Sequence, residues 1–300
     1  MVPAASLWIA FTLVGAVAQT ARNAMQRELT ATLGTAGATH VRFLFGLPFA
    51  LVFLAIALAW SGTGLPRIPL VFWPWLVVGA LAQIVGTALM LAAMGERSFV
   101  VTTAYIKTEP VQVALFGFVF LGDVLSLTMI VAIVVATLGV IITAFKAKSG
   151  EAFAGLRPTL QGLLAGGFFA LSAVCFRGAI IAVPETPFFV AASTALVASL
   201  AVQTGVLTLY LAWRERGTLI AIMRAWRPSL FAGFMGAFGS QFWFLAFSLT
   251  AAANVRTLAL IEVLFAQAIS HFMFGQRVTM REGAGIALML IGVAMLLLLR

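Results

Sequence analysis

Apolar residues run through almost the whole of this 300-residue chain, in stretches that are each long enough to cross a lipid bilayer. A membrane-spanning helix needs roughly 20 consecutive apolar residues at a rise of about 1.5 Å per residue. Hydrophobic residues make up 63% of the sequence and charged residues only 9%, which leaves too little polar surface to cover a water-soluble protein of this size. The sequence therefore predicts an all-α integral membrane protein.

Ten such stretches are separated by short connections that are rich in Gly, Pro, Ser, Lys and Arg. The predicted transmembrane helices lie near residues 4–22, 36–60, 70–94, 98–121, 125–146, 158–182, 187–212, 228–249, 252–274 and 281–299. They use nearly all of the chain, so no separate soluble domain is expected. Because ten is an even number, both termini should lie on the same side of the membrane.

Positive charge is concentrated in the connections that follow the odd-numbered spans. These connections contain Arg27, Arg97, Lys146, Lys148, Arg157, Arg214, Arg216, Arg224, Arg227, Arg277 and Arg281. Cytoplasmic connections are enriched in Lys and Arg, so this distribution predicts that the termini lie outside. The net charge of +9 is scattered between apolar spans, which favours contact with anionic lipid and gives no reason to expect a nucleic-acid partner.

The second half of the chain resembles the first. A shift of 153 positions aligns five identical pairs, Glu109 with Glu262, Gly122 with Gly275, Ile133 with Ile286, Gly139 with Gly292 and Val140 with Val293. We assign the two repeats to residues 1–150 and 151–300, with five predicted spans in each. Because five is an odd number, the repeats should be inverted about a pseudo-twofold axis in the membrane plane, with the substrate site between them near the midplane.

Small residues recur on one face of the last span in each repeat. Ala132 and Gly139 are seven residues apart, as are Gly285 and Gly292. Such faces allow two helix backbones to approach closely in lipid. We therefore expect these two spans to pack tightly, with few polar groups available to a solute.

The order of these motifs resembles that of the drug/metabolite transporter superfamily, in its ten-helix exporter branch of the EamA type. The motifs are Glu109-Pro110 inside a span, Leu121-Gly122-Asp123, and Leu138-Gly139-Val140 in the next span. The resemblance implies a secondary exporter of small metabolites, amino acids prominent among them, in the bacterial inner membrane. The chain departs from the pattern at Gln276, where an acid is common, and at Val263, which replaces the proline in the second repeat. Members of this branch often have cytoplasmic termini, the opposite of what the positive charges predict.

Four charged residues fall near the middle of predicted spans, Lys107, Glu109, Arg256 and Glu262. Each must face protein or water, because a charge at the centre of a bilayer costs about 3 kcal/mol or more. In one hypothesis the two bases bind a substrate carboxylate and the two acids receive an ammonium group or a proton. In the other, the four residues form buried ion pairs that fix the helices. The structural role is favoured for Glu109 and Glu262, and both roles remain open for the bases.

Further candidate substrate-binding residues are polar or aromatic groups inside the spans. They are Gln19, Arg22, Gln83, Thr103, Tyr105, Gln241 and Trp243. Span 228–249 is also rich in phenylalanine, which favours large neutral or aromatic amino acids as substrates.

The leading interpretation is therefore a secondary exporter of amino acids that works by alternating access as a functional monomer. One alternative is an exporter of hydrophobic cationic drugs, which usually needs an acid in the first span of a repeat; spans 4–22 and 158–182 contain no Asp or Glu. Another is a membrane enzyme that acts on lipid-linked substrates, which would require a catalytic cluster at one membrane surface. No catalytic residue, metal or cofactor is expected.

Overall fold

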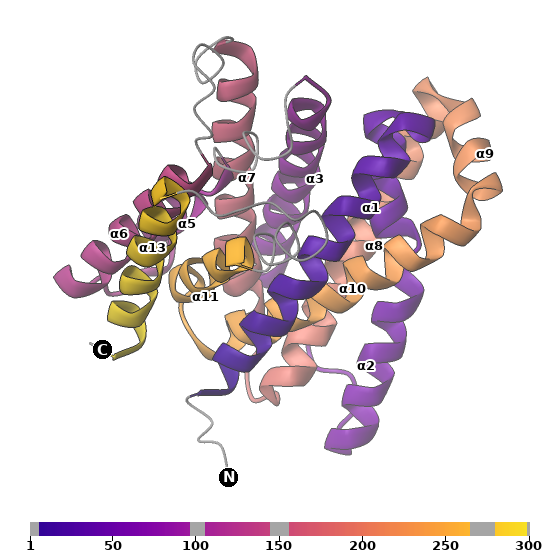
Figure 1. Cartoon of the computed structure of the whole chain (residues 1–300). Coiled ribbons are helices and arrows are strands. Elements are labelled where there is room, and N and C mark those ends of the chain that lie inside the picture. Colours follow the sequence, from indigo (N-terminus) through magenta and orange to yellow (C-terminus); the bar gives the residue numbers. More distant parts are fainter. Residues whose placement is uncertain (1–5, 97–105, 145–155, 265–279, 299–300) are drawn as a thin grey trace.

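The computed structural model describes residues 6–96, 106–144, 156–264 and 280–298, and these four ranges form a bundle of helices without strands (Figure 1). The helices of the first half are α1 (Leu7–Leu44), α2 (Leu47–Ser61), α3 (Phe72–Glu96), α5 (Glu109–Phe116) with the π-helical turn η2 (Gly117–Leu121), and α6 (Leu127–Ala144). Those of the second half are α7 (Leu156–Ile181), α8 (Phe188–Arg214), α9 (Arg216–Arg224), α10 (Trp226–Leu249), α11 (Ala252–Leu258) with the 3-10 turn η3 (Ala259–Ile261), and α13 (Met280–Leu298).

Five helical segments are long and apolar enough to cross a membrane. They are Glu28–Ser61, Phe72–Ala93, Leu160–Ile181, Phe188–Arg214 and Trp226–Leu249. Three shorter apolar segments accompany them, Glu109–Leu121, Leu127–Ile142 and Gly283–Leu298. The described residues thus form an all-helical, multi-pass arrangement, although they contain fewer full-length spans than the ten that the sequence predicts.

The first helix extends beyond residue 22, where the sequence analysis ended it. Residues 23–33 contain neither glycine nor proline, so nothing in the local sequence stops the helix. Helical geometry is broken only at Gly34, whose φ of 68° and ψ of 176° suit a residue without a Cβ. The prediction that the first helix ends near residue 22, next to Gln19 and Arg22, was therefore wrong. Both lie well inside α1, and Arg27, which was assigned to a connection, also lies in this helix.

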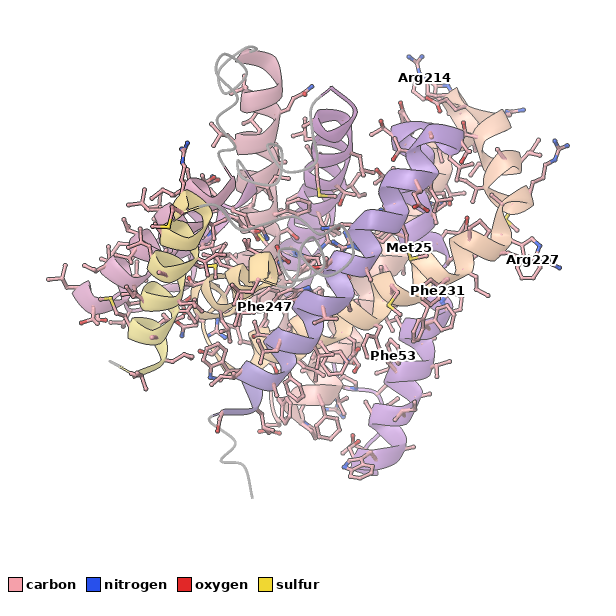
Figure 2. All side chains as sticks on the ribbon, in the orientation of Figure 1. Met25, Phe53, Arg214, Arg227, Phe231 and Phe247 are labelled. Atoms are coloured by element: carbon pink, nitrogen blue, oxygen red, sulfur yellow. The ribbon has the colours of Figure 1, made fainter. Side chains whose placement is uncertain are left out.

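The connection between α8 and α10 is helical, whereas the sequence analysis treated it as a loop. α9 places Ile222 in a buried cluster with Leu29 of α1, while Arg224 is exposed. Arg214 and Arg227, next to its two ends, point outward from the bundle (Figure 2). α9 is thus an amphipathic helix that carries the predicted positive charge on its outer surface.

Two spans that were predicted to be continuous are interrupted at matching places. In the first half a turn at residues 107–108 precedes α5, and in the second half η3 follows α11. The shift of 153 positions places residues 106–108 on 259–261, so both interruptions come directly before the paired acids Glu109 and Glu262. The duplication therefore extends from the sequence to a local departure from helical geometry.

Proline chemistry explains the first interruption. Pro110 has no backbone N–H, and its ring clashes with the carbonyl four residues earlier, so the helix cannot continue through residue 106 in regular form. Val263 occupies the matching position in the second half, and the break there is the milder 3-10 turn.

Helices of one half pack against helices of the other in the pattern expected for twofold pseudosymmetry. α1 packs along α10 and α3 packs along α7, and these two pairs are equivalent if the halves are exchanged. α2 packs against α8 and α6 against α13, so each of these two pairs joins a helix to its own counterpart. α5 packs against α11, which belongs to the equivalent span but lies on the other side of its interruption. Figure 1 shows α6 beside α13 at one side of the bundle, and α1 crossing beside α10. The two repeats therefore interlock along their whole length.

Close approaches at glycine residues give the direction of these pairs. A Cβ on Gly15 of α1 would lie 3.2 Å from the indole of Trp243, and one on Gly239 would lie 3.2 Å from the Cβ of Ala18. Increasing residue numbers in α1 thus meet decreasing numbers in α10, so the two helices are antiparallel. The approaches that give the same result for α3 and α7 are Gly79 to Cys175 and Gly86 to Phe169.

α6 and α13 cross at the small residues that the sequence analysis singled out. A Cβ on Gly139 would lie 2.6 Å from the carbonyl oxygen of Gly285, and one on Gly292 would lie 2.7 Å from that of Ala132. Neither position has room for a side chain. The predicted close packing of the last span in each repeat is confirmed, and this pair is also antiparallel.

Replacing Gly139 or Gly292 with alanine is expected to lower the thermal unfolding midpoint of the protein in detergent. The added methyl group must push two backbones apart, and overpacking of this kind costs about 1–3 kcal/mol. Gly283→Ala is the matched control, because it lies on α13 with no atom of the described residues within 4 Å of its Cβ position. Equal midpoints for all three variants would contradict the close crossing.

Candidate functional site

A cavity of about 80 Å³ lies between the two halves, beside the two helix interruptions. Its polar lining consists of Gln19, Thr20, Arg22, Asn23, Arg42, Gln83, Lys107, Glu109, Ser240, Arg256 and Glu262. Its apolar lining consists of Met90, Ile106, Phe169, Phe176, Trp243, Phe244, Phe247 and Val263. Both halves of the chain contribute polar and apolar side chains, so neither half encloses the cavity alone.

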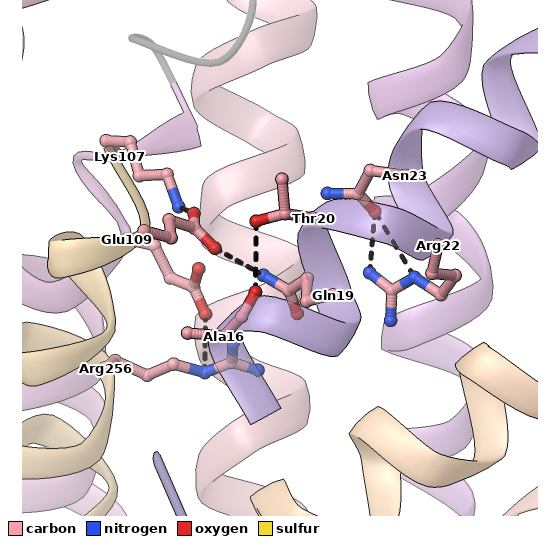
Figure 3. Close-up of polar contacts among 9 residues, drawn as sticks. Ala16, Gln19, Thr20, Arg22, Asn23, Lys107, Glu109 and Arg256 are labelled. Atoms are coloured by element: carbon pink, nitrogen blue, oxygen red, sulfur yellow. Dashed lines mark hydrogen bonds and ion pairs between the residues drawn. The ribbon is translucent and has the colours of Figure 1, made fainter. Parts of the chain in front are cut away.

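Lys107 forms an ion pair with Glu262 across the interface between the halves (Figure 3). Lys107 lies in the interruption before α5, and Glu262 directly follows η3, so each residue lies where its helix is broken. The Nε2 of Gln19 on α1 approaches the second oxygen of Glu262 at 3.5 Å. Glu262 therefore connects three helical segments that are far apart in sequence.

The second ion pair joins Arg256 of α11 to Glu109 of α5, with 3.1 Å between Nε and Oε1 (Figure 3). The guanidinium of Arg256 also lies over two aromatic rings, 4.7 Å from the ring centroid of Trp243 and 5.5 Å from that of Phe247. Cation–π contacts of this geometry are worth about 0.5–2 kcal/mol. Arg256 is thus held from one side by a carboxylate and from the other by the apolar lining of the cavity.

The two ion pairs cross between equivalent segments and fix them against each other. All four side chains are less than a tenth exposed. In such surroundings a pair adds little net stability, but removing one partner leaves an unmatched buried charge and costs about 3–5 kcal/mol. The geometry matches the hypothesis of buried ion pairs, and both acids are occupied by protein cations in this conformation.

Two further arginines reach the cavity without a carboxylate partner in the described part of the chain. Arg22 donates to Oδ1 of Asn23 from Nε at 3.3 Å and from Nη2 at 2.8 Å (Figure 3). Arg42 donates from Nη1 to the hydroxyl of Thr87 and from Nη2 to that of Ser240, both at 3.4 Å. Both arginines are only 3% exposed.

The sequence analysis missed Arg42, although the signal was present. Arg42 falls within the predicted span 36–60, and an arginine inside a span is by itself an indication of a functional site. Its partners add a feature that only the structure reveals. The shift of 153 positions places Thr87 on Ser240, so Arg42 bridges equivalent hydroxyls of the two repeats.

The cavity therefore carries an excess of positive charge. Four cations line it, namely Arg22, Arg42, Lys107 and Arg256, against the two anions Glu109 and Glu262, which leaves two positive charges without an anionic partner among the described lining residues. Charges interact more strongly in such a site than in water: two unit charges about 4 Å apart interact by about 4 kcal/mol at an effective dielectric constant of about 20, against about 1 kcal/mol in water. The electrostatics of the cavity favour an anionic group and disfavour a cationic one.

The other predicted site residues divide into three groups. Gln83 lines the cavity, and its Oε1 accepts a hydrogen bond of 2.9 Å from Nε2 of Gln203. Gln241 lies outside the cavity: its Nε2 donates to the hydroxyl of Ser193 at 2.8 Å, and it lines a separate outer groove. Its position on α10 turns it toward α8, and its assignment to substrate stays a prediction that this cavity does not support. Thr103 and Tyr105 lie outside the described residues.

The aromatic residues of α10 surround the helix, and only part of the set faces the cavity. Trp243, Phe244 and Phe247 belong to the lining. Phe238 and Phe242 line the outer groove next to Gln241 instead. The aromatic residues of this span are therefore divided between the cavity and the outer groove, and only those in the cavity can contact a bound solute there.

Within the described ranges, no three His, Cys, Asp or Glu side chains come together in an arrangement that could hold a metal ion. The charged groups of the cavity are instead organised as two ion pairs and two arginines held by neutral groups.

The model of the EamA-like transporter family matches the chain twice, over residues 6–145 and 157–298. The chain belongs to this family. EamA-like proteins are membrane transporters of small solutes in the drug/metabolite transporter superfamily, as the motifs of the sequence indicated. The double match also establishes the two-repeat architecture over nearly the whole chain.

Solved structures agree with this fold. One crystal structure that is 15% identical in sequence superimposes with a TM-score of 0.68, over 97% of this chain and 96% of that one. At this level of identity the similarity shows the fold alone. No match is found among the curated proteins.

Lys107→Met and Glu262→Leu are each expected to destabilise the protein by about 3–5 kcal/mol, because each leaves one buried charge unmatched. The double variant Lys107→Met/Glu262→Leu removes both charges and should recover most of that loss. Denaturant unfolding of the purified protein in detergent, analysed as a double-mutant cycle, measures the coupling. Additive effects of the two single variants would show that the pair does not hold the segments together.

Proposed function

We propose that this EamA-like transporter is a secondary-active exporter of small metabolites, with amino acids as the leading class, and that it works by alternating access. The observation that carries the proposal is the charged cavity between the two repeats, beside two interrupted helices. Interrupted helices at the interface of repeats are typical of substrate sites in secondary transporters. One chain completes the cavity, which supports a functional monomer, and we assign the protein to the bacterial inner membrane.

The proposed topology is ten transmembrane helices in two inverted repeats that occupy residues 1–150 and 151–300. Gly34 divides α1 into two helical parts, and the second part continues into α2 as one apolar segment. The five proposed passages of the first half are therefore the first part of α1, the second part of α1 with α2, α3, α5 with η2, and α6. The antiparallel packing of α6 against its counterpart α13 supports inversion, because equivalent helices run in opposite directions. The beginning of α1 and the end of α13 also lie toward the same end of the bundle (Figure 1).

Inversion predicts that equivalent connections face opposite sides of the membrane. Cys175 is the only cysteine, so a Cys175→Ser background allows single reporter cysteines. Thr63→Cys follows the second span and Gly217→Cys follows the seventh, and both positions are exposed. A membrane-impermeant thiol reagent applied to intact cells should label only one of them.

Thr186→Cys is the control for this labelling. Trp60 and Phe189 line the same outer groove, so the chain segments next to Thr63 and Thr186 lie at the same end of the bundle. Thr186 should therefore be labelled from the same side as Thr63. Labelling of Thr63 and Gly217 from one side would contradict inverted repeats. The exposed arginines around α9 support a cytoplasmic position for Gly217, which puts the termini outside.

Arg177 joins three segments near Phe247, a residue of the cavity lining. Its Nη1 donates to the backbone carbonyls of Phe247 and Thr250 at the C-terminal end of α10, at 2.7 and 2.6 Å. Its Nη2 lies 3.7 Å from Asp123, which follows η2. These contacts join α7, α10 and the end of the first interrupted span. In the proposed cycle they break when the cavity opens toward these segments.

The two alternative functions receive less support from the geometry. An exporter of hydrophobic cations would have to bind its substrate in a cavity lined by four cations and two acids that are already paired. A membrane enzyme would require a nucleophile, a base and an orienting group in contact, and the lining residues are instead organised into ion pairs. Both arguments favour a carrier for solutes that bear a carboxylate.

Counterflow in liposomes that contain only the purified protein tests the proposal. Liposomes preloaded with an unlabelled amino acid should transiently accumulate the same labelled amino acid, and a panel of acidic, neutral and basic solutes identifies the class. Liposomes without protein provide the control for leakage. No exchange of any solute across the panel would return weight to the enzyme hypothesis.

A further inference from the structure

The two unmatched arginines lie side by side over one glycine of α10. A Cβ on Gly236 would lie 3.0 Å from Cγ of Arg42 and 3.7 Å from Cδ of Arg22. α1 supplies both arginines, one before and one after the interruption at Gly34. Two guanidinium groups are thus brought to the same wall of the cavity, where each is almost fully buried.

Both guanidinium groups keep donors that protein acceptors do not use. A guanidinium has five N–H donors. Arg42 makes two long bonds to Thr87 and Ser240, and its buried Nε has no hydrogen-bond partner among the described residues. Arg22 directs two N–H groups to Asn23. Buried donors without partners carry a penalty of about 1–3 kcal/mol each, and more for charged groups, so this wall is incomplete without an acceptor.

The same cavity lacks a free group for a substrate ammonium. Glu109 and Glu262 are its only acids among the described lining residues, and they are paired with Arg256 and Lys107. A zwitterion would therefore find donors for its carboxylate and no carboxylate for its amine. Two uncompensated positive charges instead match a solute with one or two negative charges.

We propose that Arg22 and Arg42 form an oxyanion-binding site, and that the transported solute is a small organic anion that they hold by its carboxylate or phosphate group. The inference rests on the proposed transport function and narrows its substrate class from amino acids in general to solutes with net negative charge. Planar guanidinium groups bind such oxygens in a bidentate manner, which lysine cannot reproduce. The cavity of about 80 Å³ favours small anions in this conformation.

Malonate and its uncharged analogue malonamide test the inference, since they share a skeleton and differ in charge. Binding is measured with the full-length protein in phosphatidylcholine nanodiscs, at neutral pH and constant chloride. We expect malonate to bind the wild-type protein at least roughly tenfold more tightly than malonamide, since one charge-assisted hydrogen bond contributes about 1.5–3 kcal/mol. This comparison needs no variant and is independent of folding defects.

Arg22→Gln and Arg42→Gln should each weaken malonate binding about ten- to hundredfold, and leave malonamide binding unchanged. Arg22→Lys and Arg42→Lys keep the charge and should lose part of the affinity. Arg67→Gln is the matched control, because it removes the same charge from an exposed position in the connection between α2 and α3. It should bind malonate like the wild-type protein.

The outcomes separate this inference from the proposed function. Equal affinity for malonate and malonamide, or an equal loss in Arg67→Gln, would overturn the oxyanion site, while counterflow of other solutes would leave the transporter proposal intact. Malonate binding without exchange of any solute would support the site and contradict transport. If phosphatidylglycerol in the nanodiscs displaced malonate and no organic anion were exchanged, the site would belong to a lipid headgroup and the solute assignment would fail.

Discussion

Six charged side chains meet at the depth of a membrane interior, where each must find a partner or water because lipid offers neither. This constraint accounts for the way in which the halves are joined. The apolar helices could slide past one another in many registers, since lipid removes the hydrophobic drive for helix association. The crossed pairs Lys107 with Glu262 and Arg256 with Glu109 are satisfied in only one register. The ion pairs thus define the interface, and the small residues of α6 and α13 allow the backbones to reach it.

The helix interruptions and the charged side chains lie at the same cavity, and each helps to accommodate the other. A regular helix satisfies its own backbone groups, so breaking one inside a membrane exposes polar atoms that the surroundings must accommodate. Both breaks face the charged cavity, where polar side chains are gathered. The acids that follow the breaks occupy equivalent positions, and each pairs with a base from the other repeat. A carrier that changes its opening from one side to the other can use such breaks as hinges, because fewer helical hydrogen bonds resist bending there.

The membrane class, the duplication and the close packing of Gly139 against α13 could all be predicted from the sequence, because they depend on composition, spacing and the absence of a side chain. The helical nature of α9 could not, since it depends on burying Ile222 in a cluster with Leu29 of α1. The length of α1 was missed although no glycine or proline interrupts residues 23–33. Lys107, Glu109, Arg256 and Glu262 were recognised as a group, because charge inside a span is rare. Which residues pair with which could be seen only in the structure. The alignment of the two repeats matches the two acids with each other, whereas in space each acid contacts a base of the opposite repeat.

The hydrogen bonds of Arg42 bear on the relative stability of the two open conformations of a transporter of this kind. Its two hydroxyl partners, Thr87 and Ser240, are interchangeable under the pseudosymmetry of the repeats. If the two halves exchange roles during transport, Arg42 still has one hydroxyl partner from each half. Its hydrogen bonds therefore do not stabilise one open conformation over the other. The contacts of Arg177 with Phe247, Thr250 and Asp123 join one particular set of segments and have no such equivalent pair of partners. We therefore expect a preference between the two openings to come from contacts that only one repeat makes, such as those of Arg177.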